Sequence, residues 1–516
     1  VAIGYVAGGS VTTGVQNTLI GGLAGDAITT GNSNAALGYG ALGSNTTADA
    51  NTAVGYFSLV SNTTGAENTA VGFEALRNNS TGTPNNAFGR QALRSNSTGG
   101  ANCAFGEQAL QANTTASNNT AVGHQALTAN TTGQYNTAVG TNAGDAITTG
   151  NSNTMLGFNS GGATTTAGQN VAVGQSALTT NTTGSFNTAI GAEALTANTT
   201  AAYNTAVGYL ALTATTTGAE NVAIGKGALA ANTTGASNNA YGVAALDANT
   251  TGTANVAVGG NALGQNTTAN DNIAVGEGAL GANTTGHSNV AVGRSALTRN
   301  TTANANSALG YQALSTTTTG ANNTAMGYQA LSLSTTAADN TAFGYRALQA
   351  NTTGASNVAV GYEALKANTT AANNVALGHQ ALDLVTTGFA NIGLGTSTGS
   401  YSVNLTTGSG NILIGHVTDT TAADSSYATG IGYNIAAAAG YTTIGQAGSD
   451  IRAAHGTATW ATVSDERYKK DIVDSTAGLS FINALQPRTF KYKTLGELPE
   501  TFRAYEADST EVYKSS

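Results

Sequence analysis

The sequence is poor in charge, proline and cysteine. Charged residues make up 8% of the 516 positions, proline occurs three times, and Cys103 is the single cysteine. One thiol excludes an intrachain disulfide framework, and the place of Cys103 beside a repeated asparagine indicates a buried or half-buried filler. The formal net charge of −9 supplies no basic track for nucleic acid. No apolar run is long enough to cross a bilayer, so we expect no membrane insertion.

Metal and cofactor signals are lacking as well. The five histidines, which are His124, His287, His379, His416 and His455, are scattered without the spacing of metal ligands. No phosphate-binding loop occurs, because the glycines belong to a longer period. We therefore expect neither a metal nor another cofactor.

What the chain has in abundance is glycine, and the glycines are periodic. From Gly4 to Gly395 a glycine recurs every 17 residues, which makes 24 copies without insertion or deletion. From Asn17 to Asn391 an asparagine stands four residues before each of them. A globular core has no reason to repeat one side chain at a constant interval, whereas stacked coils align equivalent residues into ladders. The sequence predicts an all-β fold, a parallel β-solenoid or β-roll of 17-residue coils.

One coil, Asn51 to Glu67, shows the expected local structure. The residue before the glycine is always apolar, as at Val54, and Leu59 belongs to a second apolar row five positions later. Because a strand alternates faces with period two, this odd separation predicts a corner at the glycine. We expect two short strands, 51–54 and 56–60, closed by a polar turn at 62–65. At the position of Gly65, alanine alternates with glycine, which indicates a lack of room more than a positive φ.

A coil of this size encloses only a thin core of Ala, Val and Leu. One of the two large apolar rows is then left for a partner, and three chains packed side by side would bury it. We therefore expect a homotrimeric rod, whose 24 regular coils would extend roughly 115 Å at about 4.8 Å per coil.

Composition divides the chain into three regions. Residues 1–395 are the regular array, and residues 396–460 are irregular coils in which the glycine spacing changes. Residues 461–516 differ sharply, since 17 of the last 53 residues are charged, and the amphipathic run at 472–485 indicates a helix in a small α+β segment. Because the chain starts in mid-repeat and this segment lacks an obvious ending, we expect a fragment of a longer protein.

The repeated motifs NTAVG and NVAIG resemble the head repeats of trimeric autotransporter adhesins. Over residues 1–395 that resemblance implies a left-handed parallel β-roll and a trimer. Similar glycine-cornered repeats occur in phage fibre proteins.

The C-terminal region carries a more specific resemblance. Residues 464–472 are SDERYKKDI and residues 485–492 are LQPRTFKY, on either side of the amphipathic run. This combination resembles the opening of the endosialidase-type intramolecular chaperone domain at the C-terminus of phage tailspikes and tail fibres. The resemblance implies a domain that drives trimerisation of a β-stranded fibre and then cuts itself off before the serine.

The residues at this junction can support such a cut. Ser464 would attack the carbonyl of Val463, and Lys469 would accept its proton if its pKa were lowered, with Asp465 and Arg467 in supporting positions. This would be a single-turnover autoproteolysis, and no turnover enzyme is expected in the array. The alternative is a solvated helix start with Ser464 as its N-cap.

The residue after each corner glycine varies widely, which predicts an outward row. It includes a consecutive run of tyrosines, Tyr311, Tyr328, Tyr345 and Tyr362. These would form an aromatic strip suited to sugar rings or to a protein ligand. The alternative is a stacking ladder that stabilises the coils.

Together these features predict the shaft and host-recognition surface of a phage tail fibre. Its place would be the virion, and its partners would be further copies of itself and a receptor or glycan on the host cell. One alternative is a bacterial surface adhesin of the trimeric autotransporter type, located on the cell surface. Another is an ice-binding solenoid that would use the threonine rows at Thr63 and Thr64.

Overall fold

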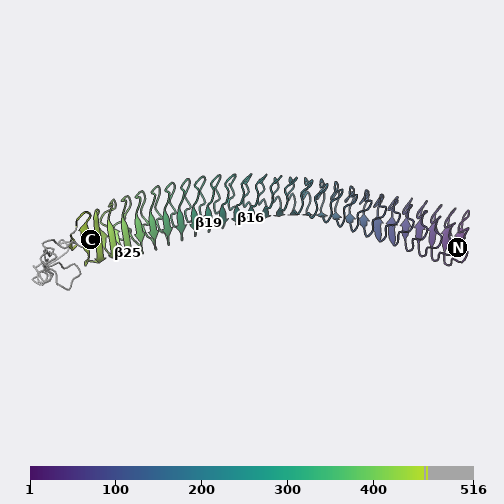
Figure 1. Cartoon of the computed structure of the whole chain (residues 1–516), viewed down its shortest axis with the longest axis horizontal. Helices are drawn as coiled ribbons and strands as arrows, with labels where there is room; N and C mark the ends of the chain where they lie inside the picture. Colours follow the sequence, from purple (N-terminus) through teal and green to yellow (C-terminus); the bar gives the residue numbers. More distant parts are fainter. Residues whose placement is uncertain (458, 460, 463–516) are drawn as a thin grey trace, which may run out of the picture. The chain divides into compact units, whose positions relative to one another are not determined.

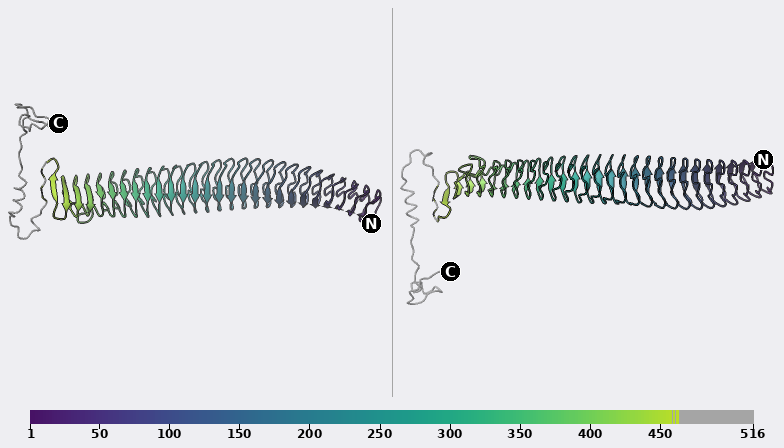
Figure 2. Two further views of the ribbon diagram at one scale, coloured as in Figure 1. Left: turned by 60° about the horizontal axis from the view of Figure 1, so that its bottom comes forward. Right: turned by 90° about the horizontal axis from the view of Figure 1, so that it is seen from above.

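The chain divides into two units, Val1–Thr462 and Val463–Ser516. A computed structural model describes residues 1–457, 459, 461 and 462, all of them in the first unit. This part contains strands and turns and no helix. It is a stack of coils along one axis (Figures 1 and 2).

Each regular coil contributes one short strand, and the strands follow one another along the stack. The strands of the regular array are β1 (Ala2–Ile3), β2 (Thr18–Ile20), β3 (Ala35–Leu37), β4 (Thr52–Val54), β5 (Thr69–Val71), β6 (Asn85–Phe88), β7 (Asn102–Phe105), β8 (Thr120–Val122), β9 (Thr137–Val139), β10 (Thr154–Leu156), β11 (Val171–Val173), β12 (Thr188–Ile190), β13 (Thr205–Val207), β14 (Val222–Ile224), β15 (Asn239–Tyr241), β16 (Val256–Val258), β17 (Ile273–Val275), β18 (Val290–Val292), β19 (Ser307–Leu309), β20 (Thr324–Met326), β21 (Thr341–Phe343), β22 (Val358–Val360), β23 (Val375–Leu377) and β24 (Ile392–Leu394). The later strands are β25 (Ile412–His416), β26 (Asp419–Thr420), β27 (Thr429–Tyr433), β28 (Ala436–Ala437), β29 (Tyr441–Gln446), β30 (Ile451–Ala454) and β31 (Ala461–Thr462).

The strands pair in parallel with a register that equals the repeat. Thr52 lies opposite Thr69, Ala53 opposite Ala70, and Val54 opposite Val71. The same offset of 17 continues from coil to coil through β24, within a single 29-stranded sheet. The predicted parallel β-solenoid of 17-residue coils is confirmed.

The core is a narrow line of alanine and leucine. Ala53 and Leu59 are completely buried, and their counterparts are buried from the second coil of the array onward. Val54 points outward and is only partly covered by its own chain. The expected inclusion of the Val row in the core is therefore wrong. Ala53 and Leu59 are six positions apart, and it is this pair that shares the interior.

The second half of the coil is not a strand, contrary to the expectation for residues 56–60. Residues 56–61 form successive turns, in which Phe57 has φ 53° and Leu59 has φ 52°. These left-handed conformations are unfavourable for bulky residues, and burial and hydrogen bonding must impose them. The N–H of Leu59 donates to the carbonyl of Ala75 (3.0 Å), and the N–H of Ser61 donates to that of Arg77 (3.1 Å). Neighbouring coils thus satisfy the backbone without a second sheet.

Glycine is required at the corner for two reasons. Gly55 has φ 135°, and a Cβ there would collide with the backbone of Gly72 in the next coil. Gly65 is different, because its φ is not positive and a Cβ would lie 2.6 Å from Asn62 Oδ1. The predicted lack of room at this second position is confirmed.

Two ladders of buried asparagine hold the coils together. The first contains Asn68, whose Nδ2 donates to the carbonyl of Gly82 (3.0 Å) and whose Oδ1 accepts the N–H of Asn85 (2.9 Å). The second contains Asn79, whose Nδ2 donates to Asn62 Oδ1 (2.9 Å) and also to Gly82 (3.0 Å). One carbonyl per coil therefore serves both ladders. The sequence pattern indicates the first ladder, whereas the asparagines of the second belong to the predicted polar turn, and their burial is not evident from the sequence.

After β24 the stack continues and then ends. Strands β24, β25, β27 and β29 remain parallel although the spacing between their glycines changes. Strand β30 pairs with β29 in the antiparallel direction, and β31 pairs with β30 in the same way. A change of strand direction thus terminates the parallel ladder, while β26 and β28 form a separate two-stranded sheet.

Candidate functional site

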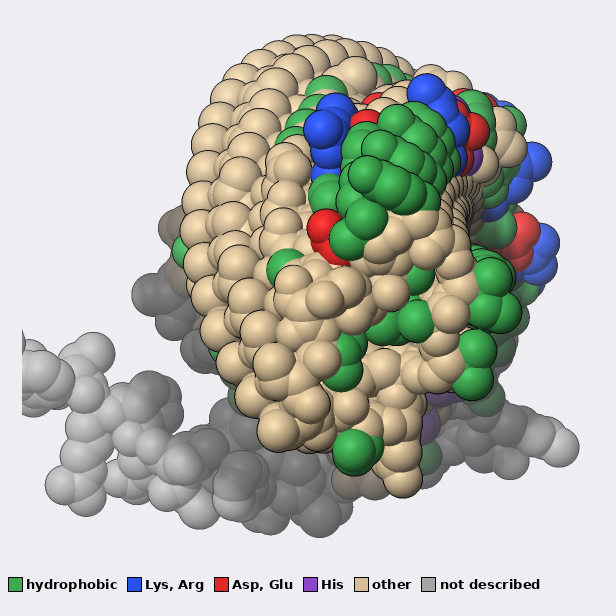
Figure 3. Space-filling model, turned by 90° about the vertical axis from the view of Figure 1, so that its right-hand side faces the viewer, with side chains coloured by type: hydrophobic (Ala, Val, Ile, Leu, Met, Phe, Trp, Pro, Cys, Tyr) green, Lys and Arg blue, Asp and Glu red, His purple; other side chains and the backbone are tan. Residues whose placement is uncertain are grey.

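Four surfaces of the described stack differ in chemistry, and each repeats along the axis. Viewed from the N-terminal end, charged side chains gather on one side of the stack, while much of the rest carries none (Figure 3). The residues of each surface come from fixed positions of the coil, because the parallel register stacks equivalent side chains.

The first surface is the outer sheet face, formed in β2–β25 by the two residues that flank the buried middle residue, as Thr52 and Val54 flank Ala53 in β4. The residue after the buried one is always large and apolar: Ile20, Leu37, Val54, Val71, Phe88, Phe105, Val122, Val139, Leu156, Val173, Ile190, Val207, Ile224, Tyr241, Val258, Val275, Val292, Leu309, Met326, Phe343, Val360, Leu377, Leu394 and Ile414. Many of these side chains are exposed by more than a third, up to 50% at Phe343. Neither position ever carries a charge in these strands. One row of this face is therefore apolar without interruption, and a large exposed apolar surface of this kind is typical of interaction sites.

The second surface is the aromatic strip, Tyr311, Tyr328, Tyr345, Tyr362 and His379. Successive ring centroids are 5.3, 5.3, 5.1 and 5.0 Å apart, and the ring planes differ by 8° to 15°. The guanidinium of Arg346 lies 5.0 Å from the ring centroid of Tyr345. Because the rings stack face to face, their faces are covered by one another, and their edges and hydroxyl groups remain for a ligand. A sugar ring stacked on a tyrosine face would find room only at an end of the strip.

A second aromatic cluster lies near the N-terminus. Tyr56 stacks on Tyr39 with ring centroids 5.7 Å apart and on Phe73 with centroids 5.4 Å apart. Phe57 contacts both tyrosines at an angle. Tyr56 and Phe73 each follow a corner glycine and so belong to the predicted outward row, whereas the contribution of Phe57 depends on its left-handed backbone and was not predicted.

The third surface is the threonine column, which contains Thr64 and its counterparts. The hydroxyl of the preceding residue, Thr63, donates to the carbonyl of Ser80 (3.1 Å), so the row of Thr63 fastens coil to coil. Thr64 is exposed, and its hydroxyl makes no hydrogen bond to any residue that the structure describes. Only one of the two threonine rows therefore presents free hydroxyl groups.

We accordingly expect the purified protein to show no thermal hysteresis. Ice recognition by a solenoid would need hydroxyl groups arrayed in two dimensions, and a single column orders them in one. Osmometry on slowly cooled, ice-seeded solutions measures this directly. Hysteresis that disappears when Thr234 is replaced by lysine would instead assign the column to ice.

The fourth surface, beside the aromatic strip, carries acidic and basic side chains in the coils where these residues occur. Glu74 accepts a hydrogen bond from Arg77 (3.0 Å) and lies 2.9 Å from Arg94 Nε, and Lys366 donates to Glu363 (2.9 Å). Burial acts to raise the pKa of Glu363, but hydrogen bonds from Lys366 and Gln380 together with nearby positive charge leave it lowered. The contact between Glu74 and Arg94 joins neighbouring coils, while the other two pairs lie within one coil.

The residues of the predicted cleavage site lie outside the described residues: Val463, Ser464, Asp465, Arg467 and Lys469. Cys103 is half-buried in β7, and burial raises the pKa of its thiol. Within the described residues no cluster of three or more His, Cys, Asp or Glu side chains is arranged to hold a metal ion. No helix in the same region has the length and hydropathy needed to cross a membrane.

Comparison with known proteins adds one finding. Residues 464–510 match the family described as the chaperone of endosialidase. No curated protein and no solved structure matches the chain. The predicted resemblance of the C-terminal region is confirmed, and the match together with the long β-solenoid is consistent with a phage tail fibre.

Proposed function

We propose that this chain is the shaft of a phage tail fibre, in which three copies pack along their outer sheet faces. The observation that carries the proposal is the order of the parts: a β-solenoid with an uninterrupted apolar row on its outer face is followed in the sequence by residues 464–510, which match the endosialidase chaperone family. A chaperone of trimeric β-fibres at this place fits a shaft that must assemble with other copies of itself.

The energetics favour assembly along this face. Completing the burial of a half-exposed Val, Leu or Phe side chain is worth roughly 1 kcal/mol. Such a residue stands in every regular coil, so a partner along the full length gains more than the roughly 4–15 kcal/mol that association costs. Isolated chains would also expose the same apolar face to aggregation, which is a reason to carry an assembly factor.

Sedimentation of the full-length protein tests the trimer. We expect wild-type protein to sediment as a trimer. For a variant with Val258, Val275 and Val292 replaced by glutamate, we expect the association constant of the trimer to fall at least tenfold. The matched control is Gly260→Glu, because Gly260 stands in the outward row where Glu107 and Glu277 occur naturally. A wild-type protein that is a stable, folded monomer at high concentration would overturn the trimer.

We further propose that the assembled fibre belongs to the virion and that its variable outward rows bind a receptor or glycan on the host cell. The rows beside the outer sheet face support this, since they change from coil to coil while the ladders do not. A bacterial surface adhesin with the same solenoid is the alternative. Binding of the purified trimer to bacterial cells, together with virion genes beside the gene, would favour the fibre.

The junction after the solenoid is proposed to be cut by the chain itself. Ser464 attacks the carbonyl carbon of Val463, Lys469 takes the serine proton, and the amide nitrogen leaves with a proton to give an ester. Water then opens the ester, which frees the carboxylate of Val463 and restores the serine. Asp465 and Arg467 support this arrangement. The support is the match of residues 464–510, which starts at this serine.

A further inference from the structure

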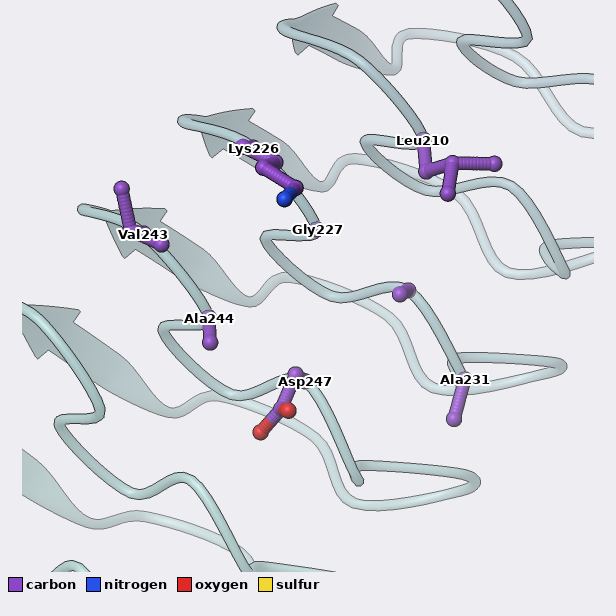
Figure 4. Close-up of a pocket in the computed structure, with 8 residues that line it drawn as sticks. Leu210, Lys226, Gly227, Ala231, Val243, Ala244 and Asp247 are labelled. Atoms are coloured by element: carbon purple, nitrogen blue, oxygen red, sulfur yellow. The ribbon is translucent and has the colours of Figure 1, made fainter.

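A groove opens in the middle of the array, on the side of the coil that follows the corner glycine (Figure 4). Two rows form this side, two and five residues after each corner glycine. In several coils they carry longer polar side chains that cross-link neighbours, as where Gln125 Nε2 donates to Gln108 Oε1 (2.9 Å) or Gln329 Nε2 donates to Gln312 Oε1 (2.9 Å).

Between residues 226 and 281 these cross-links are missing and space takes their place. The two rows here contain Gly227, Ala230, Ala244, Gly264, Gly278 and Gly281. A Cβ added to Gly227 would meet nothing within 4 Å, and one added to Gly278 would meet only Thr298 Oγ1 at 4.0 Å. Two cavities result, of about 480 Å³ and 540 Å³, and both reach Asp247.

The groove changes character along the axis. Its first part is lined by Leu210, Val243 and alanines, with Lys226 at the edge. Its second part is lined by Asn261, Gln265 and Thr298. Asp247 lies where the two parts meet, and burial raises the pKa of its carboxyl against the opposing effect of nearby backbone N–H groups.

The polar groups of the groove are available to a ligand. The side chains of Lys226, Asp247, Asn261 and Gln265 make no hydrogen bond to another side chain within the part of the chain that the structure describes. The cavity sizes lie in the range of roughly 300–1,000 Å³ that small-molecule sites occupy. The residues that line the groove follow the corner glycine, and none of them belongs to the outer sheet face.

We propose that this groove is the glycan site of the fibre and holds an extended segment of a cell-surface oligosaccharide along the axis. This inference rests on the proposed function. Sugar rings present C–H faces and hydroxyl groups together, which suits an aliphatic floor beside a carboxylate, two amides and a hydroxyl. The aromatic strip, by contrast, keeps its ring faces covered. The groove is therefore a better sugar site than the strip.

The test fills the groove with a residue that the fold already accepts. Ala244 has φ 53°, and the equivalent Gln91 and Gln108 both have φ 59°, so Ala244→Gln keeps the backbone and occupies the cavity. Asn142→Gln makes the corresponding change in the same row outside the groove. Full-length trimers would be applied to an array of defined bacterial surface oligosaccharides, and the hits measured by titration calorimetry.

We expect wild type and Asn142→Gln to bind the same oligosaccharides with equal affinity, and Ala244→Gln and Asp247→Asn to bind at least tenfold more weakly. Equal binding by all four proteins, or no oligosaccharide bound by wild type, overturns the groove site. Binding that is lost in Tyr328→Ala but kept in Ala244→Gln moves the site to the aromatic strip and also overturns it. Sedimentation of the same samples reports separately on the shaft, so failure of the groove is distinguishable from failure of the proposed function.

Discussion

Full-length protein carrying Ser464→Ala is expected to remain one uncut chain, whereas wild type is expected to yield a product that ends at Val463. The hydroxyl is the proposed nucleophile, and a methyl group cannot form the ester, so cleavage should fall below detection. Intact-mass spectrometry of the purified protein reads the outcome directly. Lys469→Arg should also stay uncut, because arginine keeps the charge and does not give up its proton near neutral pH.

Controls separate chemistry from misfolding. Ser475→Ala removes a second serine from the same segment and should be cut like wild type. The uncut Ser464→Ala protein should still sediment as a trimer, because we propose that assembly precedes the cut. If wild type stays whole while it forms trimers, the segment is a chaperone without protease activity.

Cleavage would also change how the fibre unfolds. Pairing of long parallel chains is slow because its contacts are non-local. An intramolecular chaperone segment can assist this pairing only while it is attached to the chain. After the chaperone segment has been cut off, an unfolded trimer can no longer refold with its help. The stability of the cut trimer is then set by its rate of unfolding. Cut trimers should therefore withstand heating in detergent better than uncut Ser464→Ala trimers.

Replacing Asn238 by alanine is expected to destabilise the solenoid locally by about 3 kcal/mol, because it leaves a buried donor without a partner. The Oδ1 atom of Asn238 accepts both the backbone N–H (3.0 Å) and the Nδ2 (3.1 Å) of Asn255, and its own Nδ2 donates to Gly252 (2.8 Å). All three groups are shielded from water, so alanine breaks the ladder at this coil.

The adjacent residue supplies the control. Asn239 is the first residue of β15 and faces outward, where most coils carry threonine or valine. Asn239→Thr should change stability by no more than about 0.5 kcal/mol. Hydrogen exchange read by mass spectrometry should show faster exchange in the coils around residue 238 for Asn238→Ala and no change for Asn239→Thr. Equal protection in both variants would show that the ladder does not hold the coils.

The period, the parallel register and the length of the array could be predicted from the sequence alone. Stacked coils place the same residue at the same position of every coil. A stacked-coil fold therefore accounts for the 24 glycines at a spacing of 17 and for the asparagines before them. The outward variable row and the lack of room at Gly65 could be predicted from the residue types that occur at each position of the repeat. The chaperone family followed from two short motifs, because they combine specific residues at specific spacing.

The tertiary structure decided which apolar row is the core. A period-two rule applied to Val54 and Leu59 predicted two strands, but the left-handed residues Phe57 and Leu59 turn the backbone and bring Ala53 opposite Leu59. Such conformations are imposed by hydrogen bonds between coils, and they leave no local signal when the residue is not glycine.

The same holds for the surfaces that matter to function. Whether small residues such as Gly227 and Gly278 form a groove or lie beneath other side chains depends on the neighbouring coils 17 residues away. Whether four tyrosines offer their faces or their edges depends on the angle at which the coils stack. The sequence by itself determined what repeats and how often. Only packing between coils decided which side of each residue meets the core, the solvent or a partner.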